Sequence, residues 1–295
     1  TVVKNSGSVS ADSATLQGGK ILFRASQRAE AGGTISAHGA GGGEIKILAD
    51  MVSGTVQVSG TLDASALPSP TGGGAGGGGT LLAADGGFID TSAAHVKVAD
   101  TARITTAAPN GKSGTWLIDP TDYTIAVTDP LNGSSYMSNT TLATNLGSGN
   151  ITIQTSATGT GNGDIFVNDA VTWANANSLT LNAIRNVNIN AAISNSGAGN
   201  LIVRADLNGS NTGVILFGGG NVALTGGGRA DYFYNPIDYI TPTNFAAAMG
   251  STNYTAWMLV NDVNKLQLMN TNFAGNYALG KNIDATLTAD AVNWS

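Results

Sequence analysis

The sequence contains no cysteine among its 295 residues. This absence excludes disulfide bonds, thiolate metal sites and cysteine nucleophiles. Charge is also scarce, because only 11% of the residues are charged, and 13 Lys and Arg against 19 Asp and Glu give a net charge of −6. The chain therefore lacks the basic surface that binding to a phosphate backbone requires, and we expect no nucleic-acid partner.

Long apolar runs are missing as well. No stretch of about 18 apolar residues occurs, so the sequence predicts no membrane-spanning helix and no membrane insertion. The chain opens at Thr1 without a charged and apolar leader, which is typical of a processed or excised piece. Glycine, in contrast, is abundant at 41 of 295 residues, about twice its usual share.

The composition changes along the chain. Residues 1–100 hold 20 glycines but only one asparagine, Asn5, and the other asparagines all lie beyond them. Ten of the 18 aromatic residues lie after residue 230. We therefore predict three zones: glycine-rich coils over 1–128, asparagine-rich coils over 129–228, and an aromatic-rich module over 229–295.

An internal repeat of 22 residues predicts the fold. Short apolar-polar-apolar triplets bounded by Gly and Asn indicate strands, and moving the segment around 164–183 by 22 residues places apolar residues on apolar residues. The matching pairs are Ile165 with Val187, Val167 with Ile189, Ala170 with Ala192, Val171 with Ile193, Leu179 with Leu201, Leu181 with Val203, and Ala183 with Ala205. Each unit holds three short strands, which is one coil of an all-β parallel β-helix, or β-solenoid.

The same repeat makes local predictions. Val167 and Ile189 are expected to stack inward on adjacent coils, and Asn168 and Asn190 to form a side-chain amide ladder. Residues 1–100 repeat more loosely, with Ile21 and Phe23 lying 24 residues before Ile45 and Ile47. Glycines that precede strands are expected to make turns with positive φ; they are Gly18, Gly19, Gly32, Gly33 and Gly41 to Gly43. Residues 207–213 are expected to form a loop between coils.

The aromatic-rich module is expected to contain a small helical insertion near residues 240–272. Leu259, Val263, Leu266 and Met269 recur at helical spacing, and Asn261 is placed to be the N-cap. A second short helix is predicted over 244–249. Strand-like alternation returns over 277–284, which predicts that the chain re-enters the solenoid.

Catalytic and metal-binding patterns are sparse. His38 and His95 stand in Gly- or Ala-rich turns without a second ligand at regular spacing, so we expect solvent-exposed bystanders. The glycine run 72–77 lacks the strand and helix of a nucleotide site, and the calcium-like Gly161–Ile165 occurs once. We predict no catalytic residue, no metal and no cofactor.

One segment has the composition of a sugar-binding surface. Flat rings and carboxylates suit pyranose faces and hydroxyls, and they gather in Asp231, Tyr232, Tyr234, Asp238 and Tyr239, the residues predicted to contact a glycan. The alternative, which we favour, is that these rings fill the junction between solenoid and insertion.

Several longer stretches resemble large exoproteins of the filamentous-haemagglutinin type, which the two-partner pathway secretes. They are Gly86–Ser92, Gly114–Pro120 with Tyr123–Ile125, Leu179–Ala183, Met258–Val263 and Tyr277–Ala285. The resemblance implies a right-handed β-helix stalk, secreted or held at the bacterial cell surface, that serves adhesion, aggregation or biofilm matrix. It also implies an outer-membrane secretion pore as partner and an internal or carboxy-terminal position in a longer protein.

The functional prediction is a non-enzymatic extracellular adhesin segment with a host or matrix glycan or protein as receptor. The main alternative is a carbohydrate-active enzyme, a polysaccharide lyase or hydrolase on the same scaffold, which stacked carboxylates beside Lys or Arg on one outer face would favour. A third possibility is a filament subunit. Thr1–Val3 shows no polar cap, and residues 285–295 still alternate like a strand, with Trp294 available for burial. Both ends therefore lack a cap in the sequence, so we expect head-to-tail self-association.

Overall fold

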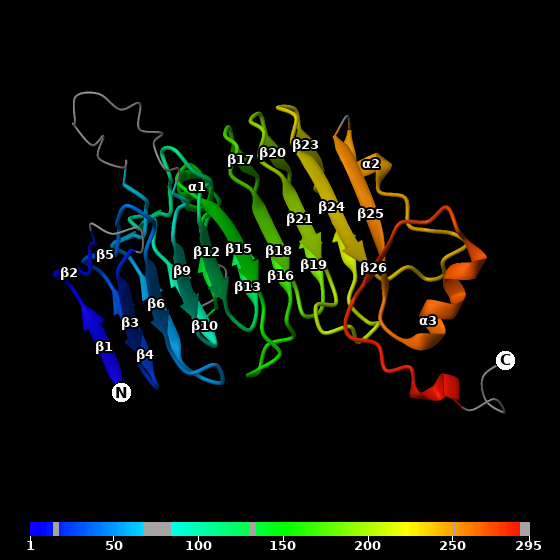
Figure 1. Cartoon of the computed structure of the whole chain (residues 1–295), viewed down its shortest axis with the longest axis horizontal. Helices are drawn as coiled ribbons and strands as arrows, with labels where there is room; N and C mark the ends of the chain where they lie inside the picture. Colours follow the sequence, from blue (N-terminus) through cyan, green and yellow to red (C-terminus); the bar gives the residue numbers. More distant parts are fainter. Residues whose placement is uncertain (14–17, 68–83, 130–133, 251, 290–295) are drawn as a thin grey trace, which may run out of the picture.

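The computed structural model describes residues 1–13, 18–67, 84–129, 134–250 and 252–289. Over this part of the chain the protein is mostly β, with parallel strands stacked in sheets and a few short helices. The strands follow one another along the long axis of the molecule, from the N-terminus to the helices at the opposite end (Figure 1). Stacked parallel sheets of this kind have the arrangement of a β-solenoid, as the repeat predicts. The glycine run 72–77 lies outside the described residues.

The described strands form four parallel sheets. The ten-stranded sheet contains β3 (Lys20–Arg24), β6 (Glu44–Leu48), β9 (Phe88–Ser92), β12 (Thr115–Asp119), β15 (Asn150–Gln154), β18 (Leu179–Asn182), β21 (Leu201–Arg204), β24 (Arg229–Tyr234), β25 (Asn253–Val260) and β26 (Tyr277–Leu279). The nine-stranded sheet contains β1 (Val2–Asn5), β4 (Arg28–Ala31), β7 (Thr55–Val58), β10 (His95–Val98), β14 (Tyr136–Met137), β13 (Tyr123–Ile125), β16 (Ile165–Val167), β19 (Val187–Ile189) and β22 (Ile215–Phe217).

Two smaller sheets complete the coils. The four-stranded sheet contains β2 (Ser8–Ser10), β5 (Thr34–Ser36), β8 (Thr61–Asp63) and β11 (Arg103–Thr105). The three-stranded sheet contains β17 (Val171–Trp173), β20 (Ile193–Asn195) and β23 (Val222–Leu224). The helix α1 (Asn139–Leu146) packs against β11 and β17, so it occupies the place of a strand between these two sheets.

Residues that the repeat places 22 positions apart are paired on adjacent strands. Val167 pairs with Ile189, and Leu181 pairs with Val203, and all four side chains are fully buried. The looser N-terminal repeat is also confirmed, because Ile21 pairs with Ile45. Burying one such side chain stabilises the fold by about 1.5–3 kcal/mol, and this gain requires a neighbouring coil that covers the side chain.

The predicted asparagine ladder is present at one corner of the coils. The Asn190 Nδ2 donates to Asn168 Oδ1 at 2.8 Å, and the two residues are 22 positions apart. A side-chain amide therefore links two adjacent coils where the backbone turns.

Glycines that directly precede strands lie where the backbone of another segment comes very close. An ideal Cβ on Gly43 would lie 1.7 Å from the carbonyl oxygen of Ala37, and one on Gly33 would lie 1.9 Å from that of Gly7. None of the glycines predicted to need positive φ is among the residues with that backbone conformation. The expectation of positive φ is therefore wrong, and at Gly33 and Gly43 the reason for glycine is that neighbouring backbone leaves no room for a Cβ.

The helical insertion is shorter than predicted. The residues after β24 form α2 (Ala246–Met249) and α3 (Val263–Leu268), which is followed by a 3₁₀ turn, Met269–Thr271. Leu259 belongs to β25, and the N-cap of α3 is Asp262, whose Oδ1 accepts from the Lys265 N–H at 2.8 Å. The predicted N-cap, Asn261, is instead buried.

The buried Asn261 amide joins a polar cluster below α3. Its Nδ2 donates to Asp206 Oδ2 at 2.8 Å, to Asn211 Oδ1 at 2.9 Å and to Asn235 Oδ1 at 3.1 Å. The Asp206 carboxylate is fully buried and also accepts from the Ser210 N–H and hydroxyl. The predicted 207–213 loop is therefore held against the coils by this carboxylate.

The two ends of the described chain differ. β1, β2 and β3 are terminal strands of their sheets. At the other end β26 pairs with β25, but residues 286–289 form a 3₁₀ turn in which Leu287 is 59% exposed. The strand-like alternation expected from residue 285 onward is therefore not found over 286–289, and Trp294 lies outside the described residues. No helix in the described ranges has the length and hydropathy to cross a bilayer.

Candidate functional site

Three of the five predicted glycan-contact residues lie in the core. β24 alternates, and Tyr232 and Tyr234 are on its buried side. The Tyr232 ring stacks on Phe245 at a centroid distance of 5.2 Å, and Tyr234 meets the same ring edge-on at 5.1 Å. Tyr239 is also buried and donates its hydroxyl to the Leu259 carbonyl oxygen at 2.8 Å. These three tyrosines therefore form the packed junction with the insertion, as the alternative reading predicted, and are not surface contacts.

The two predicted aspartates are exposed to different degrees and have separate roles. Asp238 is exposed, and its Oδ1 accepts from the Thr241 N–H at 2.6 Å and from the Thr241 hydroxyl at 2.7 Å. These bonds, the one from the hydroxyl first, lower the pKa of Asp238 and close a turn. Asp231 lies on the outward side of β24, so only this member of the predicted set is at the surface of the sheet.

An aromatic pair accompanies Asp231 on that outward side. Phe233 and Trp257 are in register on β24 and β25, with ring centroids 6.1 Å apart and planes inclined by 12°. The Trp257 Nε1 donates to Asp231 Oδ1 at 2.9 Å, and Arg229 Nη2 donates to the same oxygen at 2.6 Å. Arg229 Nη2 also donates to the Thr255 hydroxyl at 2.9 Å. We call Arg229, Asp231, Phe233 and Trp257 the outer aromatic patch.

The outer aromatic patch borders a shallow groove of about 320 Å³. Its lining is completed by Tyr277 and Ala278 of β26. The volume is at the lower end of the range for small-ligand sites. The groove therefore combines aromatic surface with a carboxylate and a guanidinium on rigid strands.

The sequence held a signal for this patch. Period-two alternation through β24 separates the outward Asp231 and Phe233 from the inward Tyr232 and Tyr234. This alternation predicts that Phe233, and not the neighbouring Tyr232 or Tyr234, is the surface aromatic residue of the strand. Trp257 becomes visible only once β25 is aligned with β24, because the two rings come from different coils.

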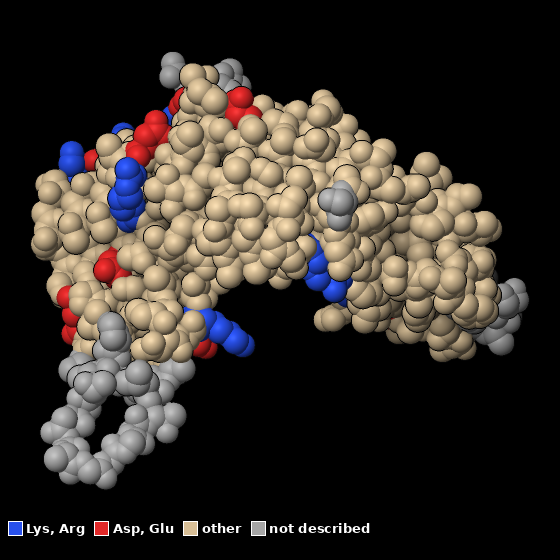
Figure 2. All heavy atoms as spheres, turned by 90° about the horizontal axis from the view of Figure 1, so that it is seen from above, with Lys and Arg blue, Asp and Glu red and all other residues tan. Residues whose placement is uncertain are grey.

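A second outward cluster lies on the N-terminal coils. Seen from above, charged side chains gather over this end of the molecule, whereas the surface toward the C-terminal end is largely uncharged (Figure 2). On the ten-stranded sheet, Lys46 pairs in register with Asp90, and Asp119 follows on the next strand, in register with Ser92. The coils between 165 and 203 lack this arrangement of stacked acidic and basic side chains, whereas the earlier coils have it.

The two carboxylates of this cluster are perturbed. Burial, with the nearby charge of Asp90 as a smaller cause, raises the pKa of Asp119 to about 6. Burial also raises the pKa of Asp90, against the hydrogen bond from Ser92. The Asp119 Oδ1 is buried with no hydrogen-bond partner in the described residues. Asp90 and Ser92 line a groove of about 770 Å³ together with Arg24 and Asp50.

His38 is not the isolated bystander that the sequence predicted. Its Nδ1 lies 2.7 Å from the Ser36 hydroxyl and 3.3 Å from Asp12 Oδ1. The Ser36 hydroxyl donates to Asp12 Oδ1, so its proton is held by a carboxylate and not by the imidazole. This geometry ties together the corners of adjacent coils and does not activate a serine nucleophile.

Among the described residues no three His, Asp or Glu side chains converge in a geometry that could hold a metal ion. Comparisons with protein-family models, with curated proteins and with solved structures found no match for this chain.

Proposed function

We propose that the chain is a non-enzymatic segment of an extracellular adhesin, a right-handed β-helix stalk that presents its outer surface to other molecules. The observation that carries the proposal is the in-register ten-stranded sheet, which runs the length of the described chain. Each coil contacts its neighbours, so the stack is rigid and its outward face is laid out in fixed columns. A rigid, elongated stack of this kind can hold binding surfaces at a distance from the cell.

The stretches that resemble secreted exoproteins support this proposal. Gly86–Ser92 and Thr115–Asp119 provide β9 and β12, which pair along their whole length. Tyr123–Ile125 is β13 on the next face. The resemblance therefore involves neighbouring structural positions, and it supports secretion through an outer-membrane pore and a place at the cell surface.

Bead adhesion under flow tests the proposal. Beads coated with the folded protein should stay on bacterial or epithelial cell layers at shear rates that remove beads coated with the heat-unfolded protein. Equal release of the two bead types would contradict the adhesin function.

Self-association through the N-terminal end is part of the proposal. β1, β2 and β3 each have a partner strand on one side within the described chain, so the other edge offers unpaired backbone groups. Analytical ultracentrifugation should show a weight-average mass that rises with concentration and falls when Val2→Pro removes a donor from that edge. The Val2 N–H points to the free edge, because the Thr1 and Asn5 carbonyl oxygens, at alternate positions of the strand, accept from the β4 side. A mass independent of concentration would contradict it.

The carboxylate cluster favours a second candidate function, a carbohydrate-active enzyme. A carboxyl group with a pKa of about 6 exchanges protons near neutral pH, and a second carboxylate with Lys46 nearby meets the requirement for paired acid and base groups. If this candidate is correct, acidic or neutral polysaccharides should yield new reducing ends or unsaturated products. Asp119→Asn and Asp90→Asn should abolish them, and Asp238→Asn, away from the cluster, should not.

A further inference from the structure

The outer aromatic patch is held in one conformation before any ligand arrives. Backbone pairing fixes β24 against β25, the Trp257 indole N–H is bonded to Asp231, and its ring is stacked with Phe233. Side chains that are already immobilised lose little further entropy when they bind a ligand. The patch is therefore preorganised.

The polar groups of the patch retain unused bonding capacity. Both bonds to the Asp231 carboxylate, from Trp257 and from Arg229, end on Oδ1. No donor reaches Asp231 Oδ2 from the described residues, and the side-chain bonds of Arg229 within them all leave from Nη2. A free acceptor and several free donors therefore lie side by side next to an aromatic surface. Two neighbouring hydroxyl groups can bond to such a pair, because one hydroxyl donates to the acceptor while the other accepts from the donor.

The charge of the patch selects among ligands that stack on rings. Arg229 and Asp231 form an ion pair, so neither an acidic sugar nor a phosphate meets a net positive charge there. The net charge of −6 further disfavours polyanions such as nucleic acids. An uncharged ring with an apolar face and hydroxyl edges meets no electrostatic penalty.

We propose that the outer aromatic patch is a binding subsite for a neutral hexopyranose unit of a glycan. The apolar C–H face of the sugar packs on the rings of Trp257 and Phe233, and two adjacent hydroxyls bond to Asp231 Oδ2 and the Arg229 guanidinium. The groove of about 320 Å³ has room for one or two sugar rings. This subsite rests on the proposed adhesin function, for which it supplies one receptor chemistry.

Isothermal titration of the full chain with neutral oligosaccharides tests the subsite. Cello-, malto- and galacto-oligosaccharides are the neutral probes, with oligogalacturonate and single-stranded DNA as charged comparisons. At least one neutral probe should bind, and the two charged ligands should bind more weakly. Trp257→Ala and Phe233→Ala should each weaken binding by about tenfold or more. Asp231→Asn, which loses the strong acceptor, should weaken it less.

Two controls make the result specific. Phe273→Ala removes an aromatic ring that is 88% exposed and lies outside the groove, and it should leave the affinity unchanged. Circular dichroism and thermal unfolding should show that each variant keeps the fold. Absence of neutral-glycan binding, preference for the charged ligands, or equal affinity of wild type and Trp257→Ala would each overturn the proposal.

The bead assay separates this subsite from the proposed function. If Trp257→Ala beads adhere as firmly as wild-type beads while no neutral glycan binds, the subsite is wrong and the adhesin function stands. If glycan binds at the patch but the beads do not adhere, the adhesin function is wrong and the subsite stands.

Discussion

The glycine-rich coils of residues 1–128 and the asparagine-rich coils of 129–228 build the same sheets with different corners. In the first zone the position before a strand of the ten-stranded sheet is glycine because neighbouring backbone passes there; an ideal Cβ on Gly87 would lie 2.0 Å from the Gly43 carbonyl oxygen. In the second zone, side-chain oxygens at the corners accept backbone N–H groups from the next coil. Asn150 Oδ1 accepts from Ser178, and Ser178 Oγ accepts from Asn200.

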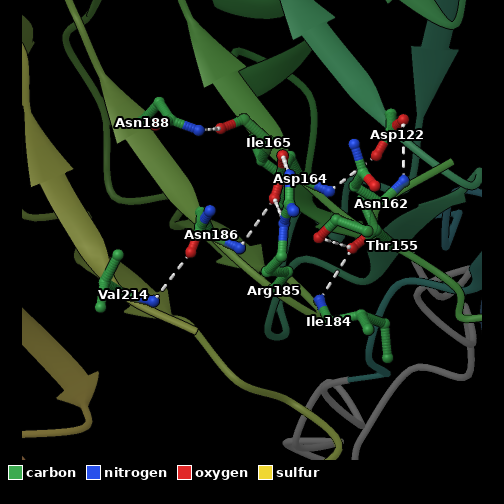
Figure 3. A network of polar contacts seen from close by, with 11 residues as sticks. Asp122, Thr155, Asn162, Asp164, Ile165, Ile184, Arg185, Asn186, Asn188 and Val214 are labelled. Carbon is green, nitrogen blue, oxygen red and sulfur yellow. Dashed lines mark hydrogen bonds and ion pairs between the residues drawn. The ribbon is translucent and has the colours of Figure 1, made fainter. Parts of the chain in front are cut away.

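At the corner before the nine-stranded sheet, side-chain oxygens accept backbone N–H groups from the next coil at three successive positions. Asp122 Oδ1 accepts from the Asp164 N–H at 2.8 Å, Asp164 Oδ1 from the Asn186 N–H at 3.0 Å, and Asn186 Oδ1 from the Val214 N–H at 3.0 Å (Figure 3). Arg185 holds both oxygens of the buried Asp164. The shift from glycine to asparagine thus reflects two ways to close a coil: removing a side chain, or using one to satisfy an orphan N–H.

The largest effect is expected from a side chain added to a glycine corner. Gly87→Ala should lower the free energy of unfolding by about 3 kcal/mol, because its Cβ would overlap the Gly43 carbonyl oxygen. Gly7→Ala is the matched control, since nothing lies within 4 Å of a Cβ there. Urea unfolding measures both. Equal stability of the two variants would break the distinction between the corner types.

A somewhat smaller loss is expected when a side chain is removed from the polar corner. Asp164→Ala should lower the free energy of unfolding by about 2 kcal/mol, because the Asn186 N–H loses its acceptor and Arg185 loses its partner. Asn190→Ala, in the more exposed amide ladder, should cost about 0.5 kcal/mol. Urea unfolding measures the two costs, and a reversed order would refute the importance of the buried ladder.

The smallest effect concerns the ends of two neighbouring strands. Asp119 is the last residue of β12 and the neutral Gln154 is the last residue of β15, each directly after the paired Ile118 and Ile153. Because the folded pKa of Asp119 is raised from 3.8 to about 6, ionisation opposes folding. The loss of stability develops as pH rises from about 4 to about 6 and is complete above that range. Asp119→Asn should therefore raise the melting temperature at pH 7–8 and leave it nearly unchanged below pH 4. A pH-independent difference would contradict a pKa of about 6.

Much of the solenoid follows from local pattern. The 22-residue alignment identified which residues pair and which point inward, because a buried column accepts only apolar side chains. The Asp122, Asp164 and Asn186 ladder has a sequence signal: each residue stands directly before a triplet whose first and third residues are apolar. Helix α1 has almost no sequence signal, because Asn139–Leu146 is rich in Asn and Thr, which favour helices weakly. Its N-cap is Ser138.

The candidate site shows where pattern stops being sufficient. The alternation of β24 already separates Asp231 and Phe233 from Tyr232 and Tyr234, because successive side chains of a strand point to opposite faces. Only the pairing of β24 with β25 decided that Trp257 lies beside Phe233. Likewise, only packing beneath α3 made Asn261 a buried donor and left Asp262 to cap the helix. Sequence determines which face a residue takes within its own strand, whereas the contacts between coils depend on how the intervening loops close.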